Sequence, residues 1–151
     1  MTYNRESKDV YYLNIAETIL RRSTCLRRKY GAVIVRDDEI IATGYNGSPR
    51  GTINCIDVGF CYRERNNIPH GERYEACKSV HAEMNAIISA SRRDMIGSTL
   101  YLAGIEADGT QIDDIAPCSM CQKLIINAGI KNVVTRNTDG SVKMKGVDFY
   151  E

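Results

Sequence analysis

Two short motifs contain residue types that can bind a metal ion and carry out catalysis with it. The first reads H-A-E over residues 81–83, and the second reads P-C-S-M-C over residues 117–121. One imidazole and two thiolates are ligands that zinc prefers. A structural zinc takes four protein ligands, whereas a catalytic zinc leaves its fourth position to water. The pattern therefore predicts an open zinc site formed by His81, Cys118 and Cys121.

Glu83 is the remaining candidate for a fourth ligand. It lies two residues after His81, and residues two apart on a helix do not share a face. Glu83 is therefore poorly placed to bind the metal and well placed to carry protons beside the water. The alternative is a structural zinc knuckle, or buried cysteines beside a histidine that caps a helix. The two motifs occurring together argue against that alternative.

Two helices must position these side chains. Residues three apart lie on one side of a helix, so both cysteines are expected on the same helical face. Pro117 is suited to the first turn of that helix, and the positive end of the helix dipole would help to keep the thiolates ionised. A second helix is expected to start at Val80 and to carry H-A-E. Its apolar face would be Met84, Ile87 and Ile88, with Arg92 and Arg93 near its end.

The rest of the chain predicts one α/β domain over residues 1–151, built on a mixed sheet of about five strands. A helix is expected over residues 10–22, followed by a basic connector over residues 23–30 that is either solvated or an anion contact. Both motif helices would start at the same end of the sheet, where they can share a metal. The expected strands are residues 31–35, 40–43, 99–102, 132–135 and 141–150. Short turns at residues 37–38 and 139–140 make the first pair and the last pair antiparallel.

Residues 47–80 form an irregular insert rich in turn-forming glycine and proline. An insert of this length in a compact domain is usually functional. Four cysteines outside the main motifs could form a second, closed zinc site that pins the insert, and His70 could replace one of them. The alternative is that they are free buried thiols, and both interpretations stay open. These four are Cys25, Cys55, Cys61 and Cys77.

Composition argues against several classes of protein. The 20 lysines and arginines nearly balance the 19 aspartates and glutamates, which gives no general case for nucleic-acid binding. The polar first residues and the lack of a long apolar run predict neither a signal peptide nor a membrane span. Six cysteines, two of them assigned to metal, favour a reducing cytoplasm over a disulfide scaffold.

The chain resembles the cytidine and deoxycytidylate deaminase family, in which H-x-E and P-C-x-x-C are the zinc motifs. The resemblance runs from residue 23 to about residue 134. It includes R-K-Y-G-A-V-I-V at residues 28–35, N-C at residues 54–55 and C-K-S-V-H-A-E-M-N-A-I at residues 77–87. The zinc motifs identify only the wider superfamily. The stretch G-Y-N-G-S-P-R-G at residues 44–51 is what indicates the deoxycytidylate (dCMP) branch.

This resemblance implies a three-layer α/β/α cytidine-deaminase-like fold and the hydrolytic deamination of dCMP to dUMP and ammonia. His81, Cys118 and Cys121 would hold Zn²⁺. Glu83 would move protons from water to the ring nitrogen and the leaving amine. The implied substrate contacts are Asn46 at the sugar, Arg92 at the phosphate, and Ala82. For Arg92 the alternative is a solvated arginine at a helix end.

The resemblance also implies a homo-oligomer, commonly a hexamer, regulated by dCTP and dTTP with Mg²⁺ through the G-Y-N-G loop. The chain departs from the family pattern where a tyrosine often follows the fourth strand, since it has R-N-T-D at residues 136–139. Its expected final hairpin is typical of free-nucleoside deaminases. Both departures concern phosphate recognition and regulation and leave the zinc chemistry unaffected. Alternatives are deamination of cytidine or CMP, or a zinc-stabilised interaction module without activity.

Overall fold

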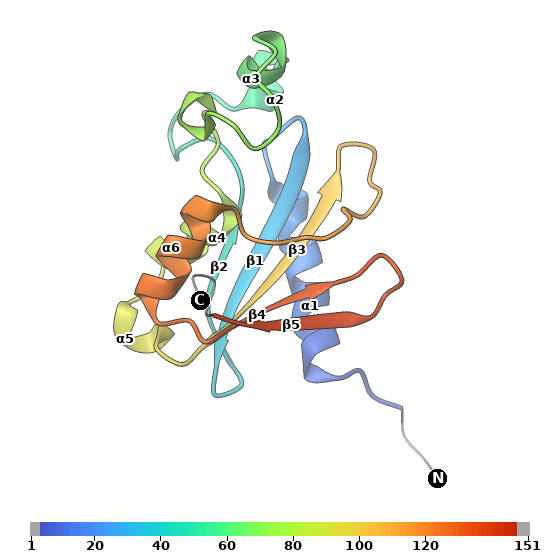
Figure 1. The fold of residues 1–151 in the computed structure, drawn as a ribbon, viewed down its shortest axis with the longest axis vertical. Helices are drawn as coiled ribbons and strands as arrows, with labels where there is room; N and C mark the ends of the chain where they lie inside the picture. Colours follow the sequence, from blue (N-terminus) through green and yellow to red (C-terminus); the bar gives the residue numbers. More distant parts are fainter. Residues whose placement is uncertain (1–3, 148–151) are drawn as a thin grey trace.

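The computed structural model describes residues 4–147. Its centre is a five-stranded sheet in the order β2-β1-β3-β4-β5 (Figure 1). β3 and β4 are parallel, and every other neighbouring pair is antiparallel. The predicted mixed sheet is therefore confirmed. The strands are β1 (Arg28–Arg36), β2 (Glu39–Tyr45), β3 (Thr99–Glu106), β4 (Asn132–Arg136) and β5 (Val142–Gly146).

Helices cover both faces of the sheet. On one face lies α1 (Lys8–Ile19), continued by the 3₁₀ turn η1 (Leu20–Arg22). On the other face lie α4 (Ala82–Ile88) and α6 (Ser119–Ala128) (Figure 1). The three-layer fold implied by the resemblance is confirmed. Within residues 4–147, no helix has the length and apolar character needed to cross a membrane.

β1 contributes to two separate cores because its side chains alternate between the faces of the sheet. Ala32 and Ile34 pack with α4 and α6. Val33 and Val35 pack with α1. A strand buried on both faces needs apolar residues at every position, which explains the uninterrupted apolar run in this part of the sequence.

Turn chemistry fixes the hairpin and the helix end that the sequence predicted. Asp37 and Asp38 have φ values of 51° and 63°, the left-handed conformation of a two-residue hairpin turn. Gly129 ends α6 with a φ of 83°, as expected for a glycine helix cap. The final hairpin also forms, since β5 pairs antiparallel with β4.

Several predicted boundaries were wrong because tertiary pairing overrides local sequence preference. Residues 28–30 were assigned to the connector, but they are strand and pair with β3. Pro117 lies before α6, whose N-cap is Cys118. The motif helix α4 ends at Ile88, and Arg92 starts a separate helix, α5 (Arg92–Met95), capped by Ser91. The end of the predicted last strand, residues 148–150, lies outside the described residues.

The insert is closed at its base and extends beyond one end of the sheet (Figure 1). Gly47 and Val80 exchange two backbone hydrogen bonds, of 3.1 and 2.7 Å. This pairing places Asn46 and His81, which flank the insert in sequence, beside one another at its base. Three short helical segments interrupt the otherwise irregular chain: α2 (Cys55–Val58), α3 (Tyr62–Arg65) and η2 (Tyr74–Ala76).

β2 approaches the backbone of α4 closely at Gly44. A Cβ atom at this position would lie 2.4 Å from the Ala82 carbonyl oxygen and 2.4 Å from the Ala86 nitrogen. Gly44→Ala is therefore expected to lower the free energy of unfolding by about 3 kcal/mol, because backbone atoms cannot yield as side chains do. Thermal unfolding measures this effect. The control is Gly146→Ala in β5, where a Cβ meets nothing within 4 Å, and equal Tm values for the two variants would contradict the packing.

Candidate metal centre

The starts of the two motif helices meet and bring the predicted ligands together. His81 is the N-cap of α4, and Cys118 is the N-cap of α6. His81 Nδ1 lies 3.5 Å from Cys118 Sγ and 3.4 Å from Cys121 Sγ. All three ligand atoms lie within 4.8 Å of one another, and Glu83 is not a member of the group.

This donor set fits zinc in both chemistry and spacing. Zinc is bound by imidazole nitrogen at about 2.0–2.1 Å and by thiolate sulfur at about 2.3 Å. Those bond lengths in a tetrahedral site place nitrogen and sulfur about 3.5 Å apart. The nitrogen–sulfur distances of 3.4 and 3.5 Å match this value. Three protein ligands leave one tetrahedral position for water or substrate.

The two thiols differ in their readiness to ionise. A hydrogen bond from Cys121, supported by one from His81, lowers the pKa of Cys118 to about 4. The same hydrogen bond, together with burial, raises the pKa of Cys121. The hydrogen bond between His81 and Cys118 raises the pKa of His81. Cys118 is thus the thiol that most readily provides a thiolate, and a cationic metal would favour ionisation of both sulfurs.

Glu83 lies in the first turn of α4 and is only 5% exposed. Burial raises the pKa of its carboxyl group, and a hydrogen bond from its own backbone amide and the positive charge of His81 oppose that rise. A carboxyl group whose pKa is raised by burial can hold a proton as well as release one. This is the property that general acid–base transfer requires.

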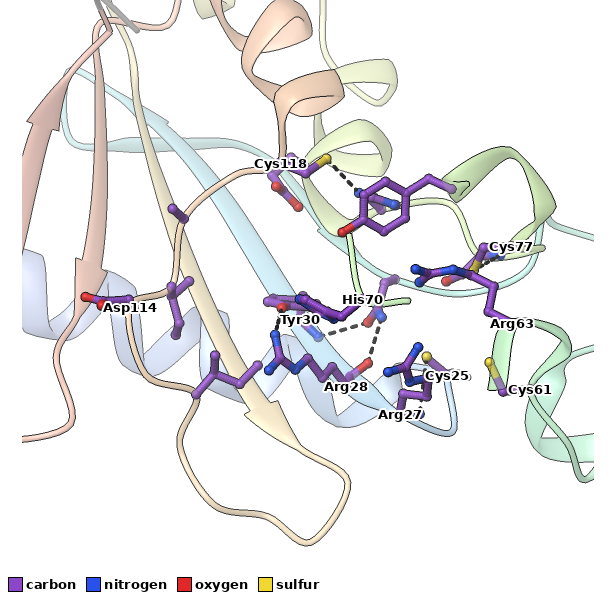
Figure 2. Close-up of a pocket in the computed structure, with 18 of the residues that line it drawn as sticks. Cys25, Arg27, Arg28, Tyr30, Cys61, Arg63, His70, Cys77, Asp114 and Cys118 are labelled. Atoms are coloured by element: carbon purple, nitrogen blue, oxygen red, sulfur yellow. Dashed lines mark hydrogen bonds between the residues drawn. The ribbon is translucent and has the colours of Figure 1, made fainter. Parts of the chain in front are cut away.

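A cavity of about 310 Å³ opens beside these residues (Figure 2). His81, Glu83 and Cys118 form part of its wall. The Tyr74 ring packs edge-on against the His81 ring, with centroids 5.1 Å apart, and holds the imidazole in place. Residues 112–116, which lead into α6, form another wall. The volume is in the range of small-molecule sites.

Comparisons with known proteins agree with this geometry. The sequence model of the cytidine and deoxycytidylate deaminase zinc-binding region matches residues 6–137. The chain belongs to this family of zinc-binding deaminases. The chain is 38% identical to a deoxycytidylate deaminase of Mycobacterium phage D29 over 136 residues, which cover 87% of this chain and 95% of the relative. It is 38% identical to the deoxycytidylate deaminase of Schizosaccharomyces pombe over 86% of this chain but only 37% of that relative's length.

Solved structures of this family share the fold. A dCMP deaminase from cyanophage S-TIM5, in apo form, has a TM-score of 0.62 and 30% identity, covering 91% of this chain and 89% of that one. The same enzyme in complex with dCMP and dUMP has a TM-score of 0.58 and 28% identity, covering 90% of each chain. A cytidine deaminase from Burkholderia pseudomallei, with a TM-score of 0.59 and 19% identity, shares the fold, covering 97% of this chain and 94% of that one.

In this deaminase-family chain, Asn46 lines the cavity and is nearly buried. Its Oδ1 accepts hydrogen bonds from Ser23 Oγ at 2.6 Å and from the Tyr30 amide at 2.9 Å. Its Nδ2 donates to the Arg28 carbonyl at 2.8 Å. Asn46 therefore fixes the start of β1, and one Nδ2 hydrogen remains for a ligand. Ala82 is fully buried in α4 and is not part of the cavity wall.

The structure does not bring Arg92 to the cavity. Its side chain is exposed on α5, where Nε donates to the Asn127 carbonyl at 3.0 Å. The family resemblance implied a phosphate contact for Arg92 near the end of the H-A-E helix, but α4 ends at Ile88 and Arg92 begins the separate helix α5. The basic residues that do line the cavity are Arg27, Arg28, Arg63 and His70.

Sequence reasoning missed Arg63 and Tyr74 because both lie in the irregular insert. Their proximity to His81 depends on how the insert folds, and no periodic pattern reports that. The one indication in the sequence was that the insert directly precedes the H-A-E motif, so its residues could lie near the metal site. The basic connector was noted as a possible anion contact, and Arg27 and Arg28 do line the cavity.

The additional cysteines gather near the cavity without forming a tight group. Cys25, Cys61 and Cys77 line it, as does His70, whereas Cys55 does not. All six cysteines are free thiols. Within residues 4–147, the sole set of potential ligands with all atoms within 4.8 Å is the main site. The second zinc site therefore stays a prediction.

Proposed function

We propose that this chain catalyses the hydrolytic deamination of dCMP to dUMP and ammonia. The observation that carries the proposal is the three-ligand group of His81, Cys118 and Cys121, of which His81 and Cys118 line the same cavity as the buried Glu83. The deoxycytidylate deaminases named above support dCMP as the substrate. The fourth metal position and Glu83 together supply what the hydrolysis of an aromatic amine needs.

Zinc, when bound, would supply a Lewis acid that brings the pKa of water into the neutral range. His81, Cys118 and Cys121 would hold it. Glu83 accepts a proton from the attacking water and delivers it to N3 of the cytosine ring. The water oxygen bonds to C4, Glu83 transfers the second water proton to the amine, and the C4–N bond breaks to release ammonia. N3 keeps its proton in the uracil product, so atoms and charge balance.

Two groups of the cavity wall, the His81 ring and the Asn46 side chain, are held in place by protein contacts. Tyr74 fixes the His81 ring by edge-on packing at 5.1 Å. Asn46 offers its free Nδ2 hydrogen to the sugar from a side chain already held by three hydrogen bonds. Because these groups are fixed before substrate binds, little ordering remains to be done in the transition state.

Ammonia release from dCMP, CMP, deoxycytidine and cytidine, measured side by side, tests the proposal. We expect the highest kcat/KM with dCMP. A preference for cytidine or CMP would assign the chain to another pyrimidine substrate. A zinc-loaded protein that releases ammonia from none of the four would favour the zinc-stabilised interaction module.

The purified protein is expected to contain zinc at no less than one ion per chain, held by the main site. The count would be two if the additional cysteines also bind an ion. Metal analysis of the wild type and of the Cys55→Ser/Cys77→Ser double variant separates these cases. A fall from two ions to one supports the second site, and a count of one in both proteins rejects it. Active protein without zinc would contradict the mechanism.

We further propose the cytoplasm as the location, because thiol ligands need a reducing compartment.

The family resemblance also favours a hexamer regulated by dCTP and dTTP with Mg²⁺. The G-Y-N-G loop, to which that regulation is attributed, lines a second cavity of about 300 Å³ that also includes Arg22 and Arg50. Sedimentation, and dCMP kinetics with and without these nucleotides and Mg²⁺, measure both features.

A further inference from the structure

Arg63 is a buried cation in the wall of the substrate cavity. It lies in α3 and is only 6% exposed. Its Nη2 donates to the Pro69 carbonyl at 3.0 Å and to the Glu72 carbonyl at 2.8 Å. Its Nε is buried without any hydrogen-bond partner. Burying a charge is costly unless it is paired and hydrogen-bonded, so an incompletely satisfied guanidinium needs an explanation.

No carboxylate of residues 4–147 forms an ion pair with Arg63. The two other arginines of the cavity wall are different. Arg27 pairs with Glu64 at 3.0 Å, and Arg28 pairs with Glu106 at 2.9 Å. Arg63 is thus the arginine of this wall whose positive charge is not balanced by a protein carboxylate within the described chain.

The position of Arg63 relative to the metal ligands suits a nucleotide. Its guanidinium carbon lies 4.8 Å from the centre of the Tyr74 ring, and that ring lies 5.1 Å from the His81 ring. One aromatic ring therefore separates Arg63 from the imidazole. In a nucleoside monophosphate, one sugar ring similarly separates the reacting base from the 5′-phosphate.

The distribution of charge around the cavity indicates the same orientation of a bound nucleotide, with its phosphate on the Arg63 side. Arg63 and Arg27 lie on the side of the cavity where Cys25, Cys61 and Cys77 gather, and Asp114 lies on the opposite side (Figure 2). An anion is therefore attracted to the Arg63 side and repelled by the other. Burial lowers the pKa of His70, and the positive charges of Arg28, Arg27 and Arg63 lower it further, as expected in a basic region.

We infer that Arg63 binds the 5′-phosphate of the substrate and makes the site prefer a nucleotide to a nucleoside. The inference rests on the proposed deaminase function. The phosphate would supply the missing counter-charge, and Nε would gain the acceptor that it lacks. Arginine suits this task because its planar fork of donors matches the phosphate oxygens.

Arg63→Gln in the zinc-loaded enzyme tests the inference. Glutamine removes the charge but keeps an amide donor for the carbonyls that Arg63 binds. We expect KM for dCMP to rise about 10- to 100-fold, the effect of losing a hydrogen bond to a charged group. The kcat/KM for deoxycytidine should be unchanged, because that substrate has no phosphate. Calorimetric binding of dUMP and of deoxyuridine gives the same comparison without turnover.

The matched control is Arg65→Gln, which removes the same charge from the same helix two residues later. Arg65 stacks on Phe60 at 4.4 Å and does not line the cavity. The Arg65→Gln variant should keep wild-type kinetics with both dCMP and deoxycytidine. This control separates a local phosphate contact from a general change in charge.

Three results would overturn the assignment of Arg63. One is an equal loss with dCMP and deoxycytidine, which would mean that Arg63 only supports the insert. Another is unchanged kinetics with both substrates. If Arg63→Gln does not fold, Arg63→Lys is measured instead, since lysine keeps the charge but lacks the planar fork of donors. The third result is that Arg63→Lys keeps the wild-type preference for dCMP. A wild-type enzyme without preference for dCMP would instead refute the nucleotide substrate itself.

Discussion

Glu83→Gln is expected to lower kcat for dCMP by at least ~10²-fold, the usual minimum for losing a general acid–base group. Glutamine keeps the size of the side chain and much of its hydrogen bonding, but it cannot accept the proton of the attacking water. Glu83 is only 5% exposed, so bulk water cannot replace it as the proton carrier. The loss could exceed this minimum, because the same carboxylate transfers protons in two steps.

Zinc should remain in the Glu83→Gln protein, because the three ligand atoms belong to other residues. Metal analysis, dUMP binding and steady-state kinetics together measure the effect. The control is Glu75→Gln, which removes an exposed carboxylate of the insert that does not line the cavity. A folded, zinc-loaded Glu83→Gln enzyme with the wild-type rate would refute the role of Glu83. A variant that loses its zinc would instead indicate that Glu83 is a ligand.

The candidate metal ligands could be predicted from the sequence because their short-range spacing indicates their chemistry. Cys118 and Cys121 lie within a single turn at the start of α6, and His81 and Glu83 begin α4. Such local relationships depend on helix geometry alone. The meeting of the two helix starts followed from the order of strands and helices, which places both at one end of the sheet.

The residues of the insert that line the cavity could not be predicted in the same way, because their positions depend on tertiary packing. Arg63 reaches the cavity only because the carbonyls of Pro69 and Glu72 hold its guanidinium beside Tyr74. Arg92 was assigned from the family resemblance and was expected near the end of the H-A-E helix, but α4 ends about one turn earlier. The ordered contacts of an irregular insert leave no periodic signal in the sequence.

Asn46 lies in a motif that was recognised from the sequence, but its structural role was not predicted. The family resemblance implied a sugar contact, and the structure shows a side chain at the end of β2 that makes two hydrogen bonds to β1 and a third to Ser23 before that strand. The pairing of Gly47 with Val80 then places the strand end next to α4. The G-Y-N-G stretch thus helps to position α4, the helix that carries His81 at its N-cap, as well as to line the cavity.

Cys121→Ser is expected to abolish zinc binding at the main site and to lower dCMP turnover by more than Glu83→Gln does. Cys121 Sγ lies 3.4 Å from His81 Nδ1, and the residue is fully buried. A serine oxygen is a harder donor on a shorter side chain, so it neither reaches the metal position nor ionises as a thiol does. Without the metal, the pKa of the attacking water rises from the neutral range back to its value in bulk water, and Glu83 alone cannot compensate for that change.

Metal analysis after dialysis, dCMP turnover and thermal unfolding measure the consequences of Cys121→Ser. Tm should also fall, because metal binding to the folded state contributes to stability. Met120→Ala is the matched control, since Met120 lies between the two cysteines, is 37% exposed and does not line the cavity. It should keep both zinc and activity. A Cys121→Ser protein that retains zinc and wild-type turnover would remove this thiol from the metal site, and with it the chemistry proposed for the cavity.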